Sequence, residues 1–520
     1  MDERYIAAID LGSHKIAISV AQVTGQNVQI IYYAEVPSKG IKYSGVLNPK
    51  KVSEQVKELI NKAENELRIN ILQAVLNLPR WEVRQEQANA SLQRSDADSS
   101  IEQEEIEFLK AQSRSYPLTD EEKEDIYGII AQSFNTVDYL NADENDIVGM
   151  VCDKLEGNFK AYIGNRRKSK NVDMVMNTLG RATSCKLFTP EYTAKAVLSE
   201  EEMANGVALV ELGGDVTSVS IFKKGILRYY SSIPFGGRSI TDDIRIECGI
   251  SEKLAENIKL AYGVCMPEKL QVLRDKIIQI NNNESGTSKQ LSVKYLSEII
   301  TARLEEIIQA SLYKIQASGF ADDLISGVVI TGGVAQTANL CTYFKELSGY
   351  DVRIGYPLRC KFSYAECNEI TETSASTIVG MILQAKDDLH LNCLTMQPAA
   401  EEKVSYEQAT EEKEVVVETR EPEIVDPQKA ISDFFTTEPK ADEPVQETHV
   451  ESEPAHEDTE EVEEPIQEIK TEEEAEEEEK PKKKKKPARQ SLFTKFGNLI
   501  WNKASNIGDM IYDLTEDSED

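Results

Sequence analysis

The sequence predicts an α/β protein in which one strand–turn–strand unit occurs twice, followed by an acidic tail and a terminal amphipathic helix. Two glycine-rich turns of the same pattern predict the duplication, one near residue 12 and the other near residue 213. The negative charge is concentrated beyond residue 400, which indicates a tail outside the folded body. Apolar residues at helical spacing return beyond residue 490, which indicates a separate helix.

The first turn joins two strand-like runs at the N-terminus, 5–11 and 15–20. Apolar residues alternate along the second run, as in a half-buried strand. Gly12 lets backbone N–H groups approach an anion, and the hydroxyl of Ser13 adds a further polar group. The turn is therefore predicted to hold a phosphate.

Two charged residues flank this turn. The carboxylate of Asp10 can hold waters of a bound Mg²⁺. The ammonium of Lys15 lies close enough in sequence to reach a β-phosphate as a point charge. A single turn of this kind is usually a plain β-hairpin, so the prediction depends on the second turn.

The second turn repeats the pattern within 206–222, where Glu211 precedes Gly213 and Gly214, and Thr217 follows. Two such turns in one chain suggest an internal duplication with a nucleotide in the cleft between the copies. Glu211 is then the second acid that can hold magnesium waters. The candidates for catalysis are Asp10, Glu211 and Thr217.

A third segment, 327–335, has the pattern of a buried strand that enters a double-glycine turn before a helix. Gly332 and Gly333 would let an adenine or ribose lie against bare backbone. The alternative for this segment alone is an ordinary turn from strand to helix.

The two phosphate turns and the adenosine turn together resemble the actin/Hsp70/sugar-kinase superfamily, whose fold is a duplicated ribonuclease-H-type unit. Within it the chain resembles the FtsA family of bacterial cell division proteins. The stretches 233–244 and 254–263 resemble two sequence segments of that family. The resemblance covers about residues 4–390 and the last 30 residues. The resemblance implies ATP as ligand and nucleotide contacts by four further residues, Gly236, Gly237, Glu256 and Lys259.

The resemblance also implies a division of the chain. The expected ranges are 1–83 and 166–200 for subdomain IA, 84–165 for an inserted subdomain 1C, 201–247 and 318–395 for subdomain IIA, 248–317 for subdomain IIB, 396–487 for a disordered linker and 488–514 for a membrane-targeting helix. In the family the 1C insert serves polymer and partner contacts, and the C-terminal peptide of FtsZ docks on IIB. Arg303 and Glu306 are candidate contacts for that peptide, with a solvated helix face as the alternative.

Two segments depart from the family's pattern for an active ATPase. The segment 211–218 begins with Glu instead of Asp and ends with Ser instead of Asp. Thr189 stands before Pro190 where the pattern has Glu, so a carboxylate that would orient the attacking water is missing there. We expect ATP to bind with slow or negligible hydrolysis, to lock the two halves together and so to favour filaments.

The net charge of −33 belongs mainly to the tail. Residues 401–480 carry −24, residues 481–490 carry +6, and residues 1–400 carry only −11. Like charges and interspersed prolines keep the acidic segment from burying enough apolar surface to fold. The acidic balance also argues against nucleic acid as a partner.

The helix expected over 488–514 has a bulky apolar face next to the basic run 482–486. This combination favours an anionic membrane surface, with folding back onto the body or a partner as the alternative. The residues expected to enter the membrane are Leu492, Phe493, Phe496, Leu499, Ile500 and Trp501. The sequence shows neither a secretory signal nor a spanning segment, and its cysteines lack CxxC pairs, so a peripheral protein on the cytoplasmic side of the inner membrane is expected.

The resemblance and the tail together imply a division-septum adaptor that binds ATP, self-assembles and tethers FtsZ to the membrane. Three alternatives stay open on the same fold. A small-molecule kinase leaves the terminal helix unexplained. An Hsp70-like chaperone would need a β-rich domain after residue 380. The pilus-assembly relative PilM lacks a tail of this length.

Overall fold

The computed structural model describes residues 3–270, 275–282 and 287–395. The chain divides into two compact units, 1–401 and 402–520, and the description below concerns the first. The predicted linker at 396–487 and the predicted membrane helix at 488–514 lie outside the described residues. Within the described ranges no helix is long and apolar enough to cross a bilayer.

The first half of the body is built on a six-stranded sheet with the order β10-β6-β1-β2-β3-β18. Its central strand β1 pairs antiparallel with β2 and parallel with β6. Both neighbours of the first turn are strands, as the alternation predicted. The strands are β1 (Arg4–Leu11), β2 (Lys15–Thr24), β3 (Asn27–Pro37), β6 (Gln73–Asn77), β10 (Ala182–Leu187) and β18 (Ser363–Tyr364).

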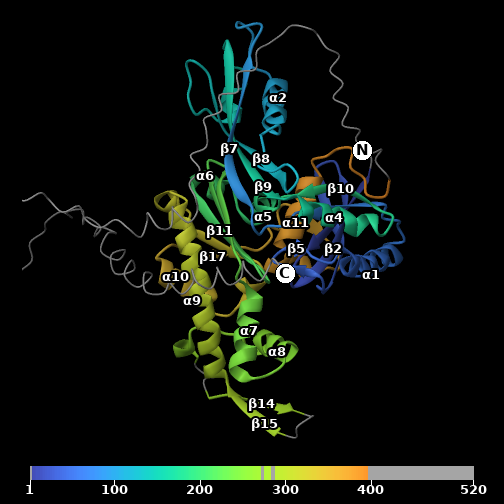
Figure 1. The fold of residues 1–520 in the computed structure, drawn as a ribbon, viewed down its shortest axis with the longest axis vertical. Helices are drawn as coiled ribbons and strands as arrows, with labels where there is room; N and C mark the ends of the chain where they lie inside the picture. The colour runs from blue at the N-terminus through green and yellow to red at the C-terminus, as the bar shows by residue number, and fades with distance from the viewer. Residues whose placement is uncertain (1–2, 271–274, 283–286, 396–520) are drawn as a thin grey trace, which may run out of the picture. The chain divides into compact units, whose positions relative to one another are not determined.

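The second half repeats this arrangement in a five-stranded sheet with the order β13-β12-β11-β16-β17. Strand β11 pairs antiparallel with β12 and parallel with β16, as β1 does with β2 and β6. The predicted duplicated fold is therefore confirmed (Figure 1). Its strands are β11 (Val207–Leu212), β12 (Thr217–Lys223), β13 (Ile226–Ile233), β16 (Val328–Thr331) and β17 (Val352–Ile354).

The duplication places two acids at matching positions. Asp10 is the penultimate residue of β1, and Glu211 is the penultimate residue of β11. Each strand then enters its glycine turn. The two turns follow equivalent strands of the two sheets. Each acid therefore lies at the strand end that leads into one of the predicted phosphate turns.

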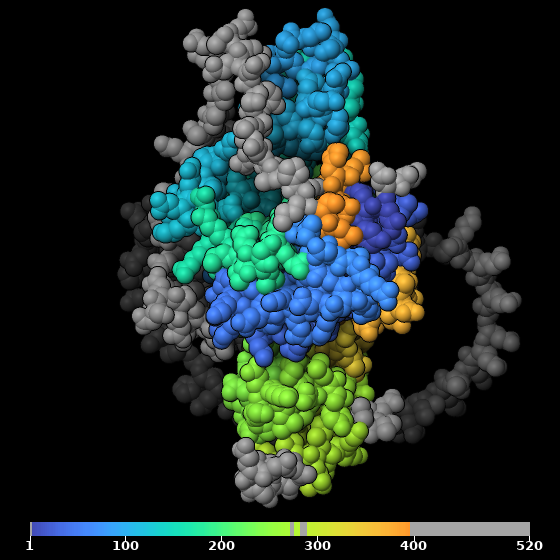
Figure 2. Space-filling model, turned by 90° about the vertical axis from the view of Figure 1, so that its right-hand side faces the viewer, coloured from blue at the N-terminus to red at the C-terminus, as the bar shows by residue number. Residues whose placement is uncertain are grey.

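Helices cover the first sheet through apolar faces. Apolar residues at helical spacing over 50–67 predict a helix. The structure has α1 there, and its buried face includes Val52, Val56, Leu59 and Ile60. It packs beside α4, and the two helices are visible side by side in blue and green in Figure 2. The helices of this half are α1 (Pro49–Leu67), α4 (Arg166–Asn177), α5 (Pro190–Val197), α6 (Glu200–Asn205) and α11 (Ser376–Ala385).

Helix α11 is buried on nearly all sides and packs against α5 and β1. It thereby belongs to the first core, although the predicted division gave 318–395 to the second half. Strand β18 likewise pairs with β3 of the first sheet. The chain therefore returns to the first half before residue 395.

The second sheet carries a helical layer and a two-stranded hairpin, β14 with β15. Helix α9 contacts α7 and β15, and in Figure 1 it lies alongside α7, with the β14–β15 hairpin at its lower end. The elements of this part are α7 (Gly237–Cys248), α8 (Glu252–Tyr262), β14 (Ile277–Asn282), β15 (Thr287–Ser292), α9 (Val293–Ala317) and α10 (Leu340–Ser348), with the 3-10 turns η1 (Pro267–Lys269), η2 (Ala321–Asp323), η3 (Gly333–Gln336), η4 (Asn368–Thr371) and η5 (Thr373–Ala375).

The range 84–165 forms a three-stranded antiparallel sheet with a core of its own. Phe134 and Phe159 meet edge to face in that core, with ring centroids 6.0 Å apart. Its elements are β7 (Arg84–Gln93), α2 (Gln103–Ser113), β8 (Glu124–Asn135), α3 (Glu144–Ile147) and β9 (Lys154–Asn165), and the short hairpin β4 (Ile41–Lys42) and β5 (Gly45–Val46) precedes α1.

Candidate functional site

The two predicted phosphate turns lie against each other. A Cβ atom added to Gly214 would lie 2.9 Å from the Cβ of His14, so the second turn touches the first without room for a side chain. The second turn is tight, because the N–H of Gly213 donates a 3.0 Å hydrogen bond to the carbonyl of Val216. The fold thus brings together turns that lie in different halves of the sequence.

Both turns present backbone donors that are not used within the protein. In the described part of the chain, no hydrogen bond uses the N–H of Ser13, His14, Gly214 or Asp215. Successive free N–H groups in a turn form a concave anion-binding site. The two turns together therefore offer the donors that a chain of phosphates requires.

A buried group of three charges lies beside the turns. Arg80 pairs with Glu211, which also accepts a hydrogen bond of 2.9 Å from the hydroxyl of Thr377. Asp10 and Glu211 are only 8% and 7% exposed, and one carboxylate oxygen of Asp10 is buried without a partner. Two carboxylates thus share one guanidinium in a site shielded from water.

The pKa values in this group follow from that arrangement. Burial raises the pKa of the Asp10 carboxyl above its ordinary value, and the nearby Arg80 charge opposes the rise. Burial alone would lower the pKa of the Arg80 guanidinium, but Glu211 and Asp10 outweigh it and raise that pKa. Arg80 therefore stays charged at any physiological pH.

The sequence reasoning missed Arg80. It lies just after β6, whose parallel pairing with β1 brings the ends of the two strands together. Asn77 at the end of β6 accepts a 2.7 Å hydrogen bond from the N–H of Leu11, next to Asp10. The signal was a basic residue placed shortly after a buried strand, but it becomes informative only once that pairing is known.

Asp215 connects the two halves across the turns. Its carboxylate accepts a 2.9 Å hydrogen bond from the N–H of Tyr43 and pairs with the guanidinium of Arg238 at 2.7 Å. Arg238 also donates to the carbonyl of Ser13 at 3.1 Å. Both oxygens of Asp215 therefore already have partners, so this carboxylate is not free to orient a water molecule.

The predicted glycines 236 and 237 pack directly on the second turn. A Cβ on Gly236 would lie 2.6 Å from the carbonyl oxygens of Gly213 and Gly214. The N–H groups of Gly237 and Arg238 donate to those same two carbonyls, at 2.9 and 2.8 Å. The start of α7 is thus fastened to the phosphate turn, and bare backbone is needed for that approach.

The two glycines of the adenosine turn differ in the space around them. A side chain would clash with the backbone at the first glycine and would face open space at the second. Gly332 has φ +92°, and a Cβ there would lie 2.4 Å from the carbonyl of Leu212. Gly333 faces open space, because a Cβ there would meet nothing within 4 Å. The open face at Gly333 is the kind of surface against which a ring can lie.

Lys259 and Glu256 form a polar group with α7. The ammonium of Lys259 donates to the carbonyl of Gly237 at 3.0 Å, to Thr241 at 2.8 Å and to Glu256 at 2.7 Å. Thr241 donates to the carboxylate of Glu256 as well. The pair predicted from the 254–263 segment therefore lies next to the second turn.

Glu256 gives a pH dependence with a definite sign. Burial opposes its ionisation, but Lys259 and Thr241 outweigh burial and hold the pKa of the carboxyl below its ordinary 4.5. Its stabilising contribution is therefore present above that ordinary value and is lost as the pH falls through the lower pKa of the folded state. We expect Glu256→Gln to lower the free energy of unfolding by about 1–2 kcal/mol at pH 7. On acidification, the free energy of unfolding of this variant should fall less than that of the wild type.

Denaturant unfolding at a series of pH values measures this effect. Glu252→Gln is the matched control, because that carboxylate lies on the same helix with a side chain 63% exposed. Parallel pH profiles for the wild type and Glu256→Gln would contradict the assignment.

Two predicted phosphate contacts have other partners in the structure. The ammonium of Lys15 bonds Tyr33 at 2.9 Å, Glu35 at 2.5 Å and Ser374 at 3.1 Å. The hydroxyl of Thr217 donates to the carbonyl of Phe235 at 2.8 Å. Their roles toward a phosphate stay predictions, and both would have to exchange these partners for it.

The candidate FtsZ contacts lie on α9. Arg303 bonds Asp243 at 2.6 and 2.9 Å and Glu306 at 2.7 Å, and its side chain is only 13% exposed. Glu306 is 44% exposed. Arg303 is therefore held in place by α7, whereas Glu306 is accessible to a partner.

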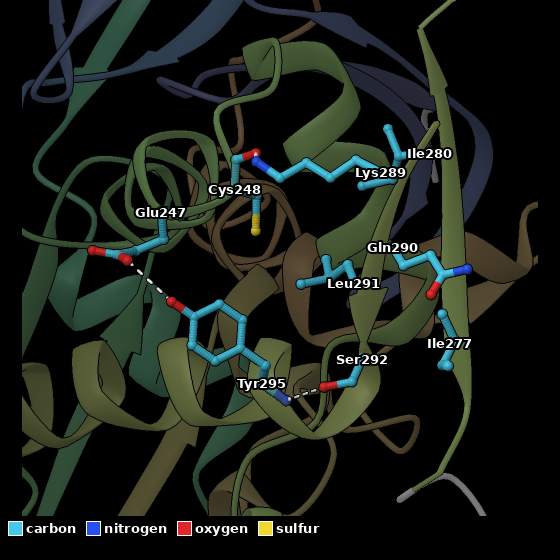
Figure 3. A pocket seen from close by; sticks show the side chains of 9 residues that line it. All are labelled: Glu247, Cys248, Ile277, Ile280, Lys289, Gln290, Leu291, Ser292 and Tyr295. Carbon is cyan, nitrogen blue, oxygen red and sulfur yellow. Dashed lines mark hydrogen bonds between the residues drawn. The ribbon is translucent and has the colours of Figure 1, made fainter. Parts of the chain in front are cut away.

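A cavity of about 360 Å³ opens near the N-terminal end of α9, between the end of α7 and the β14–β15 hairpin (Figure 3). Tyr295 crosses it and donates to Glu247 at 3.1 Å. A second cavity, of about 330 Å³, lies between β8, α3 and the start of β13. Neither cavity is lined by the phosphate turns.

A magnesium ion held through waters by Asp10 and Glu211 does not fit this arrangement. Arg80 and Thr377 already use Oε1 of Glu211, and the guanidinium places a fixed positive charge near both carboxylates. Among the residues that the structure describes, no cluster of three or more His, Cys, Asp or Glu offers another metal site. A nucleotide fits better, because the turns supply free N–H donors and Gly333 an open face.

Comparisons with known proteins agree with this fold. A family model described as "Cell division protein FtsA" matches residues 208–380. The cell division protein FtsA of Escherichia coli K12 is 26% identical over 402 residues, which cover 75% of this chain and 92% of that protein. FtsA of Neisseria meningitidis serogroup B is 26% identical over 359 residues, 68% of this chain and 84% of its own.

A solved structure of a PilM-PilN type IV pilus biogenesis complex superposes with a TM-score of 0.52 at 12% identity, over 73% of this chain and 98% of that one. The duplicated sheets and the paired turns thus show an actin-like fold. Within that fold the chain is similar to the cell division protein FtsA, as the sequence resemblance predicted. PilM shares the fold alone.

Proposed function

We propose that this chain is a nucleotide-binding, actin-like cell division protein that links FtsZ to the membrane at the division septum. The observation that carries the proposal is the similarity to FtsA proteins along most of the folded body, including the second turn and the adenosine turn. The free donors of the two turns support nucleotide binding independently of that similarity.

ATP is the proposed nucleotide. Its phosphates would bind the N–H groups of the two turns, and its adenosine would lie near Gly333. The two halves are already joined without it, by Asp215 with Tyr43, by Arg238 with Ser13, and by Arg80 with Glu211. ATP then strengthens an existing closure, which favours the filament-forming conformation.

Hydrolysis is expected to be slow. Thr189 stands at the start of α5 with its hydroxyl buried and without a partner, and Glu191 next to it pairs with Lys195 at 3.0 Å. A carboxylate free to orient water is therefore lacking at the start of α5. Steady-state phosphate release measures this, and we expect no multiple turnover. Rapid release that disappears in Asp10→Asn would contradict the expectation.

FtsZ is the proposed partner, bound through its C-terminal peptide to the part of the chain that contains α8 and α9. This part offers the exposed carboxylate of Glu306 and the cavity beside Tyr295 (Figure 3). Self-association and contacts with other division proteins are proposed for the insert, 84–165. Val137 and Leu140 at its edge are 80% and 75% exposed, which suits a contact surface.

A peptide-binding measurement tests the FtsZ contact. We expect a labelled C-terminal peptide of FtsZ to bind the full chain, and Glu306→Ala to weaken binding by about tenfold if its carboxylate bonds the peptide. Glu298→Ala is the control, because it removes an equally exposed carboxylate from the same helix. Equal affinities for the two variants would contradict the role of Glu306, and absence of binding by the wild type would contradict the partner.

Attachment to the membrane is proposed through 488–514, which lies outside the described residues. Its support is the sequence pattern: a basic run followed by an amphipathic helix. The proposed location is therefore peripheral, on the cytoplasmic side of the inner membrane.

A further inference from the structure

Arg80 lies between the two carboxylates that the sequence offered for magnesium. Its guanidinium pairs with Glu211, and its charge acts on Asp10 as well. The side chains of Arg80 and Glu211 are 12% and 9% exposed. The charge of the cleft is thus set by a side chain that is part of the fold.

One oxygen of Glu211 is committed to this arrangement, because Oε1 accepts from both Arg80 and Thr377. A magnesium ion held through waters by the two carboxylates would also lie close to a guanidinium that cannot lose its proton. Repulsion between these positive charges therefore disfavours a divalent ion while Arg80 is in place.

The backbone of Arg80 is connected to the first phosphate turn by hydrogen bonds through Ser44. Its N–H donates to the hydroxyl of Ser44 at 3.2 Å, and the N–H of Ser44 donates to the hydroxyl of Ser13 at 2.9 Å. Its carbonyl accepts from the hydroxyl of Tyr230 at 2.6 Å. These bonds hold Arg80 against both halves at the edge where the turns meet.

One donor of Arg80 is still available. Its Nε–H is buried and has no hydrogen-bond partner. One carboxylate oxygen of Asp10 is likewise buried without a partner. A buried donor without a partner costs stability unless a ligand or water satisfies it. Phosphate oxygens are the ligands that a guanidinium binds best.

We propose that Arg80 is the resident cation of this cleft and neutralises the phosphates of a nucleoside di- or triphosphate in place of a divalent metal ion. Nucleotide binding by this chain is then independent of magnesium. The proposal rests on the nucleotide binding proposed above. Glu211 acts as a positioning residue that holds the guanidinium, and Asp10 adds a buried negative charge near it, so that neither acid serves to hold metal-bound water.

The test is binding of a fluorescent ADP to the full chain in excess magnesium and in EDTA. The wild type is expected to bind equally in both, within about twofold. In Arg80→Gln the affinity in EDTA is expected to fall by about tenfold or more, and magnesium to restore part of it, because the two carboxylates are then free. Arg84→Gln, which removes a nearby but 38% exposed arginine, should behave as the wild type.

A second readout follows Mn²⁺ by electron paramagnetic resonance in the presence of ADP. No site-bound Mn²⁺ is expected in the wild type, and one bound ion in Arg80→Gln. Wild-type binding that requires magnesium, or stoichiometric Mn²⁺ uptake by the wild type, would overturn the role of Arg80 while leaving nucleotide binding intact. Absence of ADP binding in both buffers would overturn both. If Arg80→Gln does not fold, the two wild-type measurements still decide.

Discussion

Replacing Arg80 by Met is expected to lower the free energy of unfolding by about 3–5 kcal/mol. The substitution keeps much of the side-chain volume, but it leaves Glu211 buried without its ion-pair partner and removes one of the two positive charges that act on buried Asp10. Breaking one partner out of a buried ionic group is costly because the remaining charge has no water to solvate it. Denaturant unfolding of the full chain measures the loss.

Two further variants make this prediction specific. The double variant Arg80→Met with Glu211→Gln should recover about half of the loss, because the uncompensated carboxylate is removed while an acceptor for Thr377 is kept. Arg84→Met is the control: that arginine forms ion pairs with Glu86 and Glu124 near the surface, and should cost about 1 kcal/mol or less. Equal losses for Arg80→Met and Arg84→Met would show that the buried group does not contribute as described.

Gly332→Ala is expected to destabilise the protein by about 3 kcal/mol, and Gly333→Ala by less than about 1 kcal/mol. The first residue combines φ +92° with a Cβ that would lie 2.4 Å from the carbonyl of Leu212. That oxygen belongs to the last residue of β11, so it cannot move without disturbing the second sheet. Thermal unfolding distinguishes the two alanines.

The same pair separates stability from ligand binding. Because Gly333 faces open space, an added methyl group should leave the fold intact and narrow the surface proposed for adenosine. We expect Gly333→Ala to weaken ADP binding by about tenfold while its melting temperature stays near the wild-type value. Unchanged ADP affinity in this variant would place the adenosine elsewhere.

The sequence predicted the parts of the fold that have a local signal. Alternation after Lys15 predicted β2, helical spacing predicted α1, and the repeat of the glycine turns predicted two equivalent sheets. Each of these signals is contained in a short stretch of chain, so periodicity and turn chemistry are sufficient to read it.

Features that depend on distant strand pairing were not predicted. Arg80 meets Glu211 only because β6 lies parallel to β1 and the two sheets face each other at their turns. Arg238 meets Asp215 and Ser13 for the same reason. The return of α11 to the first sheet also has no local signal, because a helix buried on all sides shows no stripe that identifies its partner.

Lys15 illustrates the opposite limit. The sequence places its ammonium near the first turn, but the side chain extends to Tyr33, Glu35 and Ser374 instead. Burial opposes ionisation of Glu35, yet Lys15 and Tyr33 outweigh it and hold the pKa of that carboxyl below its ordinary value. Spacing along the chain gives the position of a residue but not the partners that its side chain reaches.

Co-flotation of FtsZ with vesicles that contain anionic lipid tests the central proposal most directly. The full chain is predicted to carry FtsZ into the floating vesicle fraction, and the truncated chain 1–487 is predicted to bind FtsZ but leave it in the dense fraction. The truncation removes the amphipathic helix while keeping the folded body and the basic run. If FtsZ remains in the dense fraction with the full chain, or floats equally well with the truncation, the proposed link between FtsZ and the membrane is contradicted.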